Sequence, residues 1–122
     1  MLADNQIYRG YTLFVARRCV GELHLLPAQE RAQFLADMAT VAEAVFHAFR
    51  PRKLNYEMLG NSVPHLHWHL IPRYADDPKP EWPIWSNAAF LDAPRKTALA
   101  DSDLRAMRDA LRAALGGASR AR

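Results

Sequence analysis

Apolar and polar residues alternate in short stretches that predict three strands. Residues 11–15 (Tyr-Thr-Leu-Phe-Val) are aromatic, β-branched or aliphatic and follow the turn-forming pair Arg9-Gly10. Residues 54–59 predict a second strand. Residues 66–74 predict a third, with the clearest alternation in the chain.

Apolar residues recur at helical spacing in two longer stretches. Pro27 suits the first turn of a long helix that ends at Arg50-Pro51, with an apolar stripe of Leu35, Met38, Ala42, Val45 and Phe49. A final helix, over about residues 102–115, has Asp101 or Ser102 as its cap and Gly116-Gly117 as its end. Its inward positions are Leu104, Met107, Leu111 and Leu115.

These elements do not follow a regular βαβ rhythm. The fold class predicted is therefore α+β, an antiparallel β-sheet with one long packed helix and a C-terminal helix. The 122 residues form a single domain, with a core over about residues 4–75. Residues 76–86 are rich in proline and tryptophan, and we expect them to lie extended over another surface. Trp82 and Trp85 in this segment are expected to pack into the core rather than to stack on a ligand.

Composition excludes several classes of protein. Half of the residues are hydrophobic and 24% are charged, which is typical of a globular protein and not of a disordered one. No apolar run approaches the roughly 18 residues of a membrane span, and residues 1–5 lack signal-peptide character, which predicts a cytoplasmic protein. The single Cys19 excludes an intramolecular disulfide. The net charge of +3 does not indicate a nucleic-acid partner.

Three histidines stand at alternating positions, His65, His67 and His69. Because side chains alternate along a strand, we expect all three imidazoles on one face and Leu66, Trp68 and Leu70 on the other, under the long helix. An imidazole pKa near 6.5 suits nucleophilic or acid–base catalysis.

Metal binding is the competing interpretation of these histidines. The outer two residues start about 13 Å apart in an extended strand, too far for both rings to reach one ion. An adjacent pair would need a third ligand from His24, His47, Cys19 or a carboxylate, and none has a recognisable spacing. We therefore predict no metal and no other cofactor.

A neutral His67 flanked by two histidines suits attack on phosphorus. Just upstream, Gly60 allows a close backbone approach, and Asn61 and Ser62 supply amide and hydroxyl donors. This turn is a candidate phosphate cradle in front of the histidine strand.

The sequence His65-Leu-His-Trp-His-Leu-Ile71 resembles the defining motif of the histidine triad (HIT) superfamily, and the similarity covers roughly residues 10–74. The resemblance implies a nucleotidyl hydrolase or transferase, usually homodimeric, that acts on a nucleoside phosphate joined to a leaving group. Transferase branches commonly carry glutamine in place of the third histidine, so His69 implies the hydrolase side.

The resemblance also implies roles for individual residues. His67 would be the nucleophile, His69 would contact phosphate oxygens and help the leaving group depart, and His65 would orient the other two. The implied substrate contacts are Asn55, Asn61, Ser62, and Asp4 or Asn5 at the ribose.

The chain departs from the family pattern at three places. Tyr11 and Cys19 stand where many members have histidines; Tyr11 can still donate to a phosphate oxygen, and we expect Cys19 to be an inert buried residue. Members usually have some twenty more residues at the start, so either translation begins upstream or the base pocket is more open. The predicted substrate is a nucleoside phosphoramidate or a dinucleoside polyphosphate. The alternatives are a catalytically weakened nucleotide-binding or regulatory protein and a histidine metal-binding protein.

Overall fold

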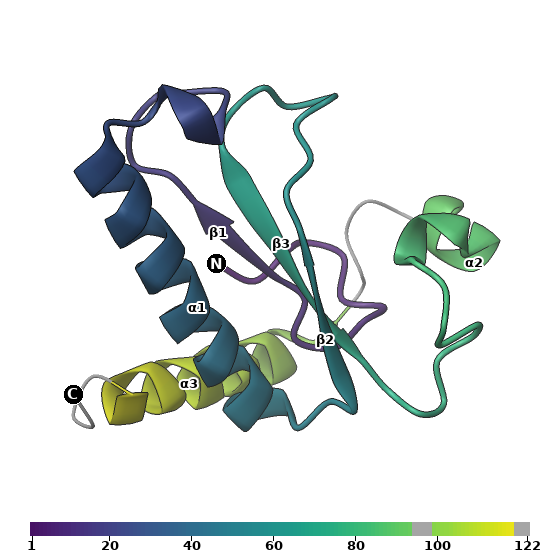
Figure 1. The fold of residues 1–122 in the computed structure, drawn as a ribbon. Coiled ribbons are helices and arrows are strands. Elements are labelled where there is room, and N and C mark those ends of the chain that lie inside the picture. Colours follow the sequence, from purple (N-terminus) through teal and green to yellow (C-terminus); the bar gives the residue numbers. More distant parts are fainter. Residues whose placement is uncertain (94–98, 119–122) are drawn as a thin grey trace.

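The computed structural model describes residues 1–93 and 99–118, which form a three-stranded antiparallel sheet with helices on both faces (Figure 1). The strands are β1 (Thr12–Val15), β2 (Lys53–Glu57) and β3 (His67–Arg73), in the order β1-β3-β2. The predicted α+β class and all three strands are confirmed. The central position goes to the strand that carries two of the histidines.

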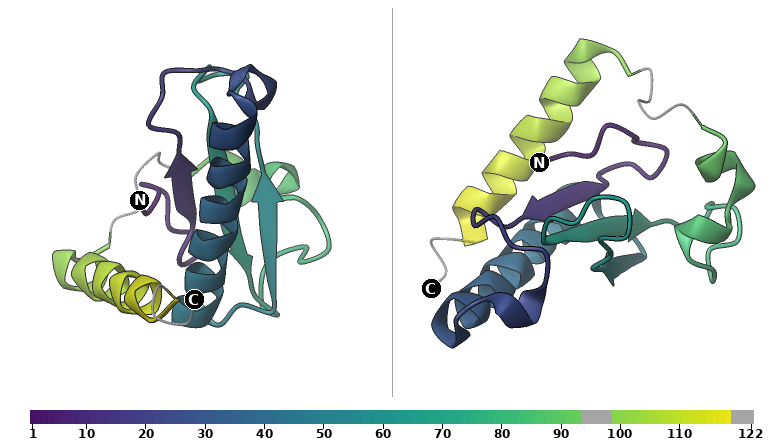
Figure 2. Two further views of the ribbon diagram at one scale, coloured as in Figure 1. Left: turned by 60° about the vertical axis from the view of Figure 1, so that its left-hand side comes forward. Right: turned by 90° about the horizontal axis from the view of Figure 1, so that it is seen from above.

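The long helix α1 (Ala28–Phe49) lies along one face of the sheet, and α3 (Asp101–Ala118) crosses its C-terminal half (Figures 1 and 2). Ala42, Val45 and Phe49 of α1 form one core cluster with Leu70 of β3 and Met107 of α3. The predicted stripes are buried at Ala42, Val45, Phe49, Met107 and Leu111. Leu35 is only partly buried, and its neighbour Phe34 is buried instead.

Three helix ends differ from the predictions. Pro27 is the cap before α1 rather than a residue of its first turn, and Arg50 closes the helix with a positive φ of 51°. Helix α3 begins at Asp101, so both predicted caps lie within its first turn. It continues through Gly116 and Gly117 to Ala118, so the glycine pair does not end it.

The prediction that the segment after β3 lies extended is wrong. The segment folds into turns, a 3₁₀ turn at Ile84–Ser86 and the short helix α2 (Ala88–Leu91). Buried Ile84 and Phe90 pack on Tyr8, Tyr11 and Ile71, on the face of the sheet opposite α1. Trp82 and Trp85 are 59% and 38% exposed, so the prediction that they join the core is wrong. Smaller apolar residues of the segment fill that space.

The loop before β1 is held by buried Gln6. Its amide donates to the carbonyl oxygens of Ala3 and Tyr11 and accepts from the N–H of Gly10. Gly10 has a φ of +88°, and a Cβ there would lie 2.4 Å from the Phe49 ring. This close approach to the end of α1 requires glycine, and it fixes where Tyr11 enters the sheet.

Candidate active site

Strand register determines which side chains share a face of the sheet. His69 of β3 pairs with Leu13 of β1 and with Glu57 of β2, and His67 pairs with Val15. Paired residues point to the same side, so these side chains stand on the face away from α1. Leu66 and Leu70 are 1% and 0% exposed on the α1 side, and Trp68 packs beside them. The predicted division into an imidazole face and an apolar face is confirmed for His67 and His69, whereas His65 lies before the start of β3.

The three histidines are half-buried and hydrogen-bonded in sequence. His65 Nε2 lies 2.8 Å from the carbonyl oxygen of Ala16, at the end of β1. His67 Nδ1 lies 2.5 Å from the carbonyl oxygen of His65, and His67 Nε2 lies 3.0 Å from His69 Nε2. The rings of His67 and His69 are thus linked directly, whereas His65 joins them through its backbone carbonyl and turns its own ring to Ala16.

The partners determine where the ring protons reside. A carbonyl oxygen can only accept, so His65 carries its proton on Nε2 and His67 carries its proton on Nδ1. The Nε2 of a neutral His67 then carries a lone pair. His69 must therefore donate the proton of the hydrogen bond between the two rings. The basic nitrogen of His67 therefore lies away from its own backbone and faces His69.

Tyr11, the residue just before β1, completes this row. Its hydroxyl lies 2.5 Å from Nδ1 of His69, and the two rings lie 5.9 Å apart. With the proton of His69 on Nε2, its Nδ1 accepts and the Tyr11 hydroxyl donates. Burial, followed by the charge of Glu57, raises the pKa of Tyr11, so the hydroxyl keeps its proton.

His69 is neutral in this environment. Burial, followed by the charge of a protonated His67, lowers the pKa of His69 to about 4. At neutral pH His69 is a hydrogen-bond donor rather than an imidazolium cation.

Glu57 and Trp85 form a wall beside His69. The indole N–H of Trp85 donates to the Glu57 carboxylate, and the Trp85 ring lies edge-on to the His69 ring at 5.8 Å. Trp85 also packs edge-on against Phe90 at 5.5 Å. This partly exposed tryptophan thus leaves an aromatic surface next to the histidines.

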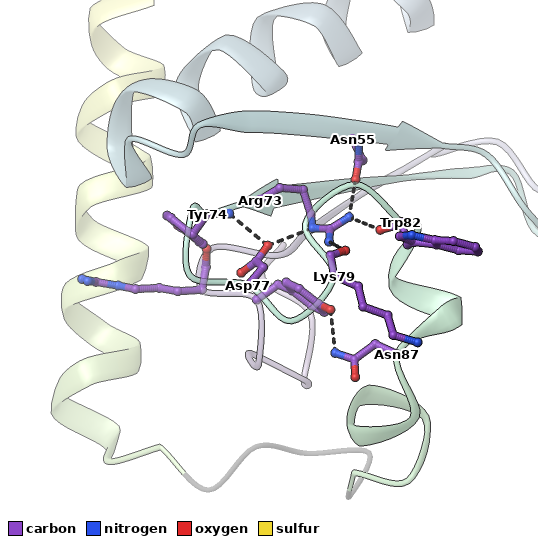
Figure 3. Close-up of polar contacts among 9 residues, drawn as sticks. Asn55, Arg73, Tyr74, Asp77, Lys79, Trp82 and Asn87 are labelled. Atoms are coloured by element: carbon purple, nitrogen blue, oxygen red, sulfur yellow. Dashed lines mark hydrogen bonds and ion pairs between the residues drawn. The ribbon is translucent and has the colours of Figure 1, made fainter.

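The far end of β3 carries a buried polar cluster centred on Arg73, drawn in Figure 3. Its guanidinium donates to the Asp77 carboxylate at 2.9 Å and to the Asn55 side-chain oxygen at 3.0 Å. It also donates to the backbone carbonyls of Trp82 and Lys79, and it lies over the Tyr8 ring. Arg73 therefore fastens the segment that carries Trp85 to the sheet.

The other predicted substrate contacts lie in different places. Asn55 shares the histidine face, but its oxygen is taken by Arg73. Asn61 and Ser62 are exposed in the loop before β3, and neither side chain hydrogen-bonds to another described residue. Asp4 is exposed in the N-terminal loop, where the Asn5 oxygen accepts from the N–H of Ile7 at 3.0 Å. The structure thus joins Tyr11 to the histidines, whereas no hydrogen bond joins Asn61 or Ser62 to them among the described residues.

Cys19 is exposed in the loop after β1, so the expectation of a buried cysteine is wrong. The expectation rested on the general tendency of free cysteine to be buried, but here Cys19 follows two exposed arginines in a loop. Among the described residues, no three histidine, cysteine or carboxylate side chains gather closely enough to hold a metal ion.

Two cavities lie near the sheet, and the histidines line neither. One of about 620 Å³ lies between β1 and α1, with Phe14, Leu26 and Phe34 among its lining residues. The other, of about 540 Å³, lies between β2 and the segment before Trp85, and it is lined by Asn55, Glu57 and Trp82 among others. This second cavity adjoins the histidine face, because Asn55 and Glu57 belong to both.

Glu57, Trp85 and Arg73 were not predicted as part of this site. Glu57 stands two positions from Asn55 on a predicted strand, so alternation alone places both on one face. The contact of Trp85 with His69 depends on the fold of the segment after β3, for which the sequence has no periodic signal.

The family model described as HIT domain matches residues 1–76. The protein named "Protein hit" of Bacillus subtilis (strain 168) is 30% identical. The match covers 63% of this chain and 66% of that relative, so the chain spans just under two thirds of the relative's length. A solved histidine triad protein from Marinobacter aquaeolei VT8 is similar with a TM-score of 0.76 at 25% identity, over 96% of this chain and 80% of the other. A histidine triad protein from Bradyrhizobium japonicum has a TM-score of 0.73 at 28% identity, over 88% and 78% of the two chains.

Proposed function

Because this chain belongs to the HIT domain family, we propose that it is a nucleotidyl hydrolase with His67 as its nucleophile. The observation that carries the proposal is the bond from His67 Nδ1 to the carbonyl oxygen of His65. That bond keeps the ring proton on Nδ1, so the lone pair of Nε2 can attack once His69 turns its own proton to a phosphate oxygen, and it stabilises the positive charge that the ring then acquires. The proposed substrate is a nucleoside phosphoramidate or a dinucleoside polyphosphate.

In the first proposed step, the Nε2 lone pair of His67 forms a bond to the α-phosphorus. The bond from phosphorus to the leaving group breaks, and its electron pair departs with that group. Water then attacks the nucleotidyl-His67 adduct, the P–N bond breaks, its electron pair returns to Nε2, and the water proton passes to solvent. No metal or other cofactor takes part in this proposed sequence.

The surroundings supply donors and space for such a substrate. His69 can move its Nε2 proton from His67 to a phosphate oxygen, and Asn61 and Ser62 have uncommitted donors in the adjoining loop. The cavity beside Asn55 and Glu57 is within the size range of small-ligand sites, roughly 300 to 1,000 Å³. We assign the base or the leaving group to that cavity, with Asp4 or Asn5 at the ribose.

The proposal extends to the state of the protein. We propose a cytoplasmic homodimer that binds nucleotides and neither nucleic acid nor membranes. Among the described residues, no helix has the length and apolar character needed to cross a membrane. Light scattering after size-exclusion chromatography checks the dimer.

A single-turnover reaction with chelator present tests the mechanism. The wild-type protein is mixed with adenosine phosphoramidates and diadenosine polyphosphates, and intact mass is followed for an acid-labile nucleotidyl adduct. We expect adduct and product in the wild type, neither in His67→Ala, and both in His47→Ala, whose histidine is exposed on α1 beside Glu43. Adduct formation by His67→Ala would remove the mechanism. AMP binding without any turnover in the wild type would favour the alternative of a nucleotide-binding regulatory protein.

A further inference from the structure

The hydrogen bond between Tyr11 and His69 carries an inference about the leaving group, and this inference rests on the proposed function. Tyr11, His69, His67 and the carbonyl oxygen of His65 form one chain of hydrogen bonds. The chain starts at a hydroxyl and ends at an oxygen that only accepts. With neutral rings, every proton in it must therefore point the same way, from Tyr11 toward His65.

The opposite arrangement at His69 is excluded by its neighbour. If Nδ1 of His69 carried the proton, its Nε2 lone pair would face the Nε2 lone pair of His67 at 3.0 Å. The Tyr11 hydroxyl prevents this by donating to Nδ1. His67, by contrast, rests on a carbonyl oxygen, which stabilises a charged ring. The Tyr11 hydroxyl thus keeps His69 a neutral donor, whereas the His65 carbonyl allows His67 to become charged.

Other charged or titratable groups near His69 do not change this assignment. They are His67 on the same strand and Glu57 on β2. The Glu57 carboxylate accepts from the indole of Trp85, and its charge strengthens the hold of Tyr11 on its own proton. On the other side, Phe90 packs near the Tyr11 ring and brings no charge.

We propose that Tyr11 is a positioning residue that holds His69 with its proton on Nε2, and that the site therefore expels leaving groups that depart without a proton. His69 can donate a hydrogen bond to a phosphate oxygen. Its Nε2 proton cannot be given away unless Nδ1 takes the proton of Tyr11, which would leave a buried phenolate. The P–O bond of a phosphoanhydride breaks with its electron pair on a weakly basic phosphate oxygen, whereas the P–N bond of an alkyl phosphoramidate leaves a strongly basic nitrogen. Phosphoanhydrides such as dinucleoside polyphosphates are the substrate class that fits.

The ¹⁵N spectrum of the histidine rings tests the positioning role directly. In the wild type we expect a pyridine-like Nδ1 and a pyrrole-like Nε2 for His69, assigned by comparison with His69→Gln. In Tyr11→Phe we expect both shifts to move toward the averaged value, because only the Nε2 lone pair of His67 then favours the Nε2–H tautomer. Tyr8→Phe is the matched control: it also loses a buried hydroxyl that packs near Phe90, but its partner is Asn87. A pyrrole-like Nδ1 of His69 in the wild type would overturn the inference.

The dependence of the rate on the leaving group tests the second part of the proposal, that leaving groups depart without a proton. Rates of adduct formation are compared for aryl esters of AMP with phenols of graded acidity, for a dinucleoside polyphosphate and for an alkyl phosphoramidate. We expect a steep dependence on leaving-group basicity and at least about a hundredfold preference for the anhydride, the size of a missing general acid. Tyr11→Phe should slow all substrates by a similar factor, roughly tenfold, while Tyr8→Phe should slow none.

Two kinetic results would contradict the inference. Equal rates on the anhydride and the alkyl phosphoramidate would show that a proton does reach the leaving group. A loss in Tyr11→Phe confined to basic leaving groups would make Tyr11 a proton source rather than a positioning residue. Absence of both adduct and product would instead remove the proposed function and, with it, the leaving-group preference, while the ¹⁵N spectrum would still decide the tautomer.

Discussion

Arg73 and Asp77 form an ion pair at 2.9 Å in which the side chains are only 4% and 9% exposed. The same Asp77 oxygen accepts from the N–H of Tyr74, so the pair also closes the turn after β3. Removing one partner leaves the other charge buried, which typically costs about 3 to 5 kcal/mol.

We expect Asp77→Asn to lower the free energy of unfolding by about 2 to 4 kcal/mol, since the amide keeps part of the hydrogen bonding. Urea denaturation measures the change. Glu30→Gln is the control, because its pair with Arg18 is equally short, at 2.7 Å, but about half exposed, and should cost at most about 1 kcal/mol. Equal losses in both variants would mean that the Arg73 cluster does not stabilise the fold.

Gly10→Ala should destabilise the protein through two effects. A residue with a side chain resists the φ of +88°, and the new Cβ would lie 2.4 Å from the Phe49 ring. Together we expect a loss of about 2 to 4 kcal/mol in the free energy of unfolding. Gly116→Ala, where nothing lies within 4 Å of the added Cβ, should not destabilise α3. A Gly10→Ala variant as stable as the wild type would contradict the tight contact.

The low pKa of His69 predicts how stability depends on pH. The native ring titrates at about 4, while an unfolded histidine titrates near 6.5, so the unfolded chain binds more protons between these values. The free energy of unfolding should therefore fall as the pH drops from about 6.5 to about 4, with an uptake of about one proton on unfolding. His69→Gln should flatten this part of the profile relative to the wild type, as measured by urea denaturation at each pH. An unchanged slope in that variant would place the proton uptake on another group.

Trp85 should report ligand binding at the histidines. Its ring lies 5.8 Å from that of His69, while Trp82 is 59% exposed and donates no side-chain hydrogen bond to a described residue. We expect AMP to change the tryptophan fluorescence of the wild type and of Trp82→Phe, and to have little effect on Trp85→Phe. A response retained in Trp85→Phe and lost in Trp82→Phe would move the nucleotide to the other side of the segment.

The sequence predicts the parts of the fold that repeat along the chain. The period of two around His67 and the helical stripe that includes Val45 each reflect one buried face, and both are observed. The predicted helix ends were less accurate. Asp101 favours a cap and Gly116 favours a helix end in any sequence, and neither preference depends on the packing of α3 against α1.

The parts of the site that depend on tertiary contacts were not predicted. The contact of Trp85 with His69 depends on the turns that Arg73 holds in the preceding segment. An arginine in a strand does not indicate such an anchoring role from the sequence. Tyr11 was predicted as a site residue, but its hydrogen bond to His69, 58 residues away, was not predicted. Such partners are decided by strand order, which the spacing of one sequence does not specify.

Strand β3 begins with the proposed nucleophile and ends with the arginine that anchors the segment bearing the aromatic wall. One strand thus holds both His67 and the anchor of the segment that carries Trp85, and that segment reaches His69 only through the Trp85 side chain. Replacing the segment after β3 should therefore change the surface beside His69 while His67 keeps its place on the sheet.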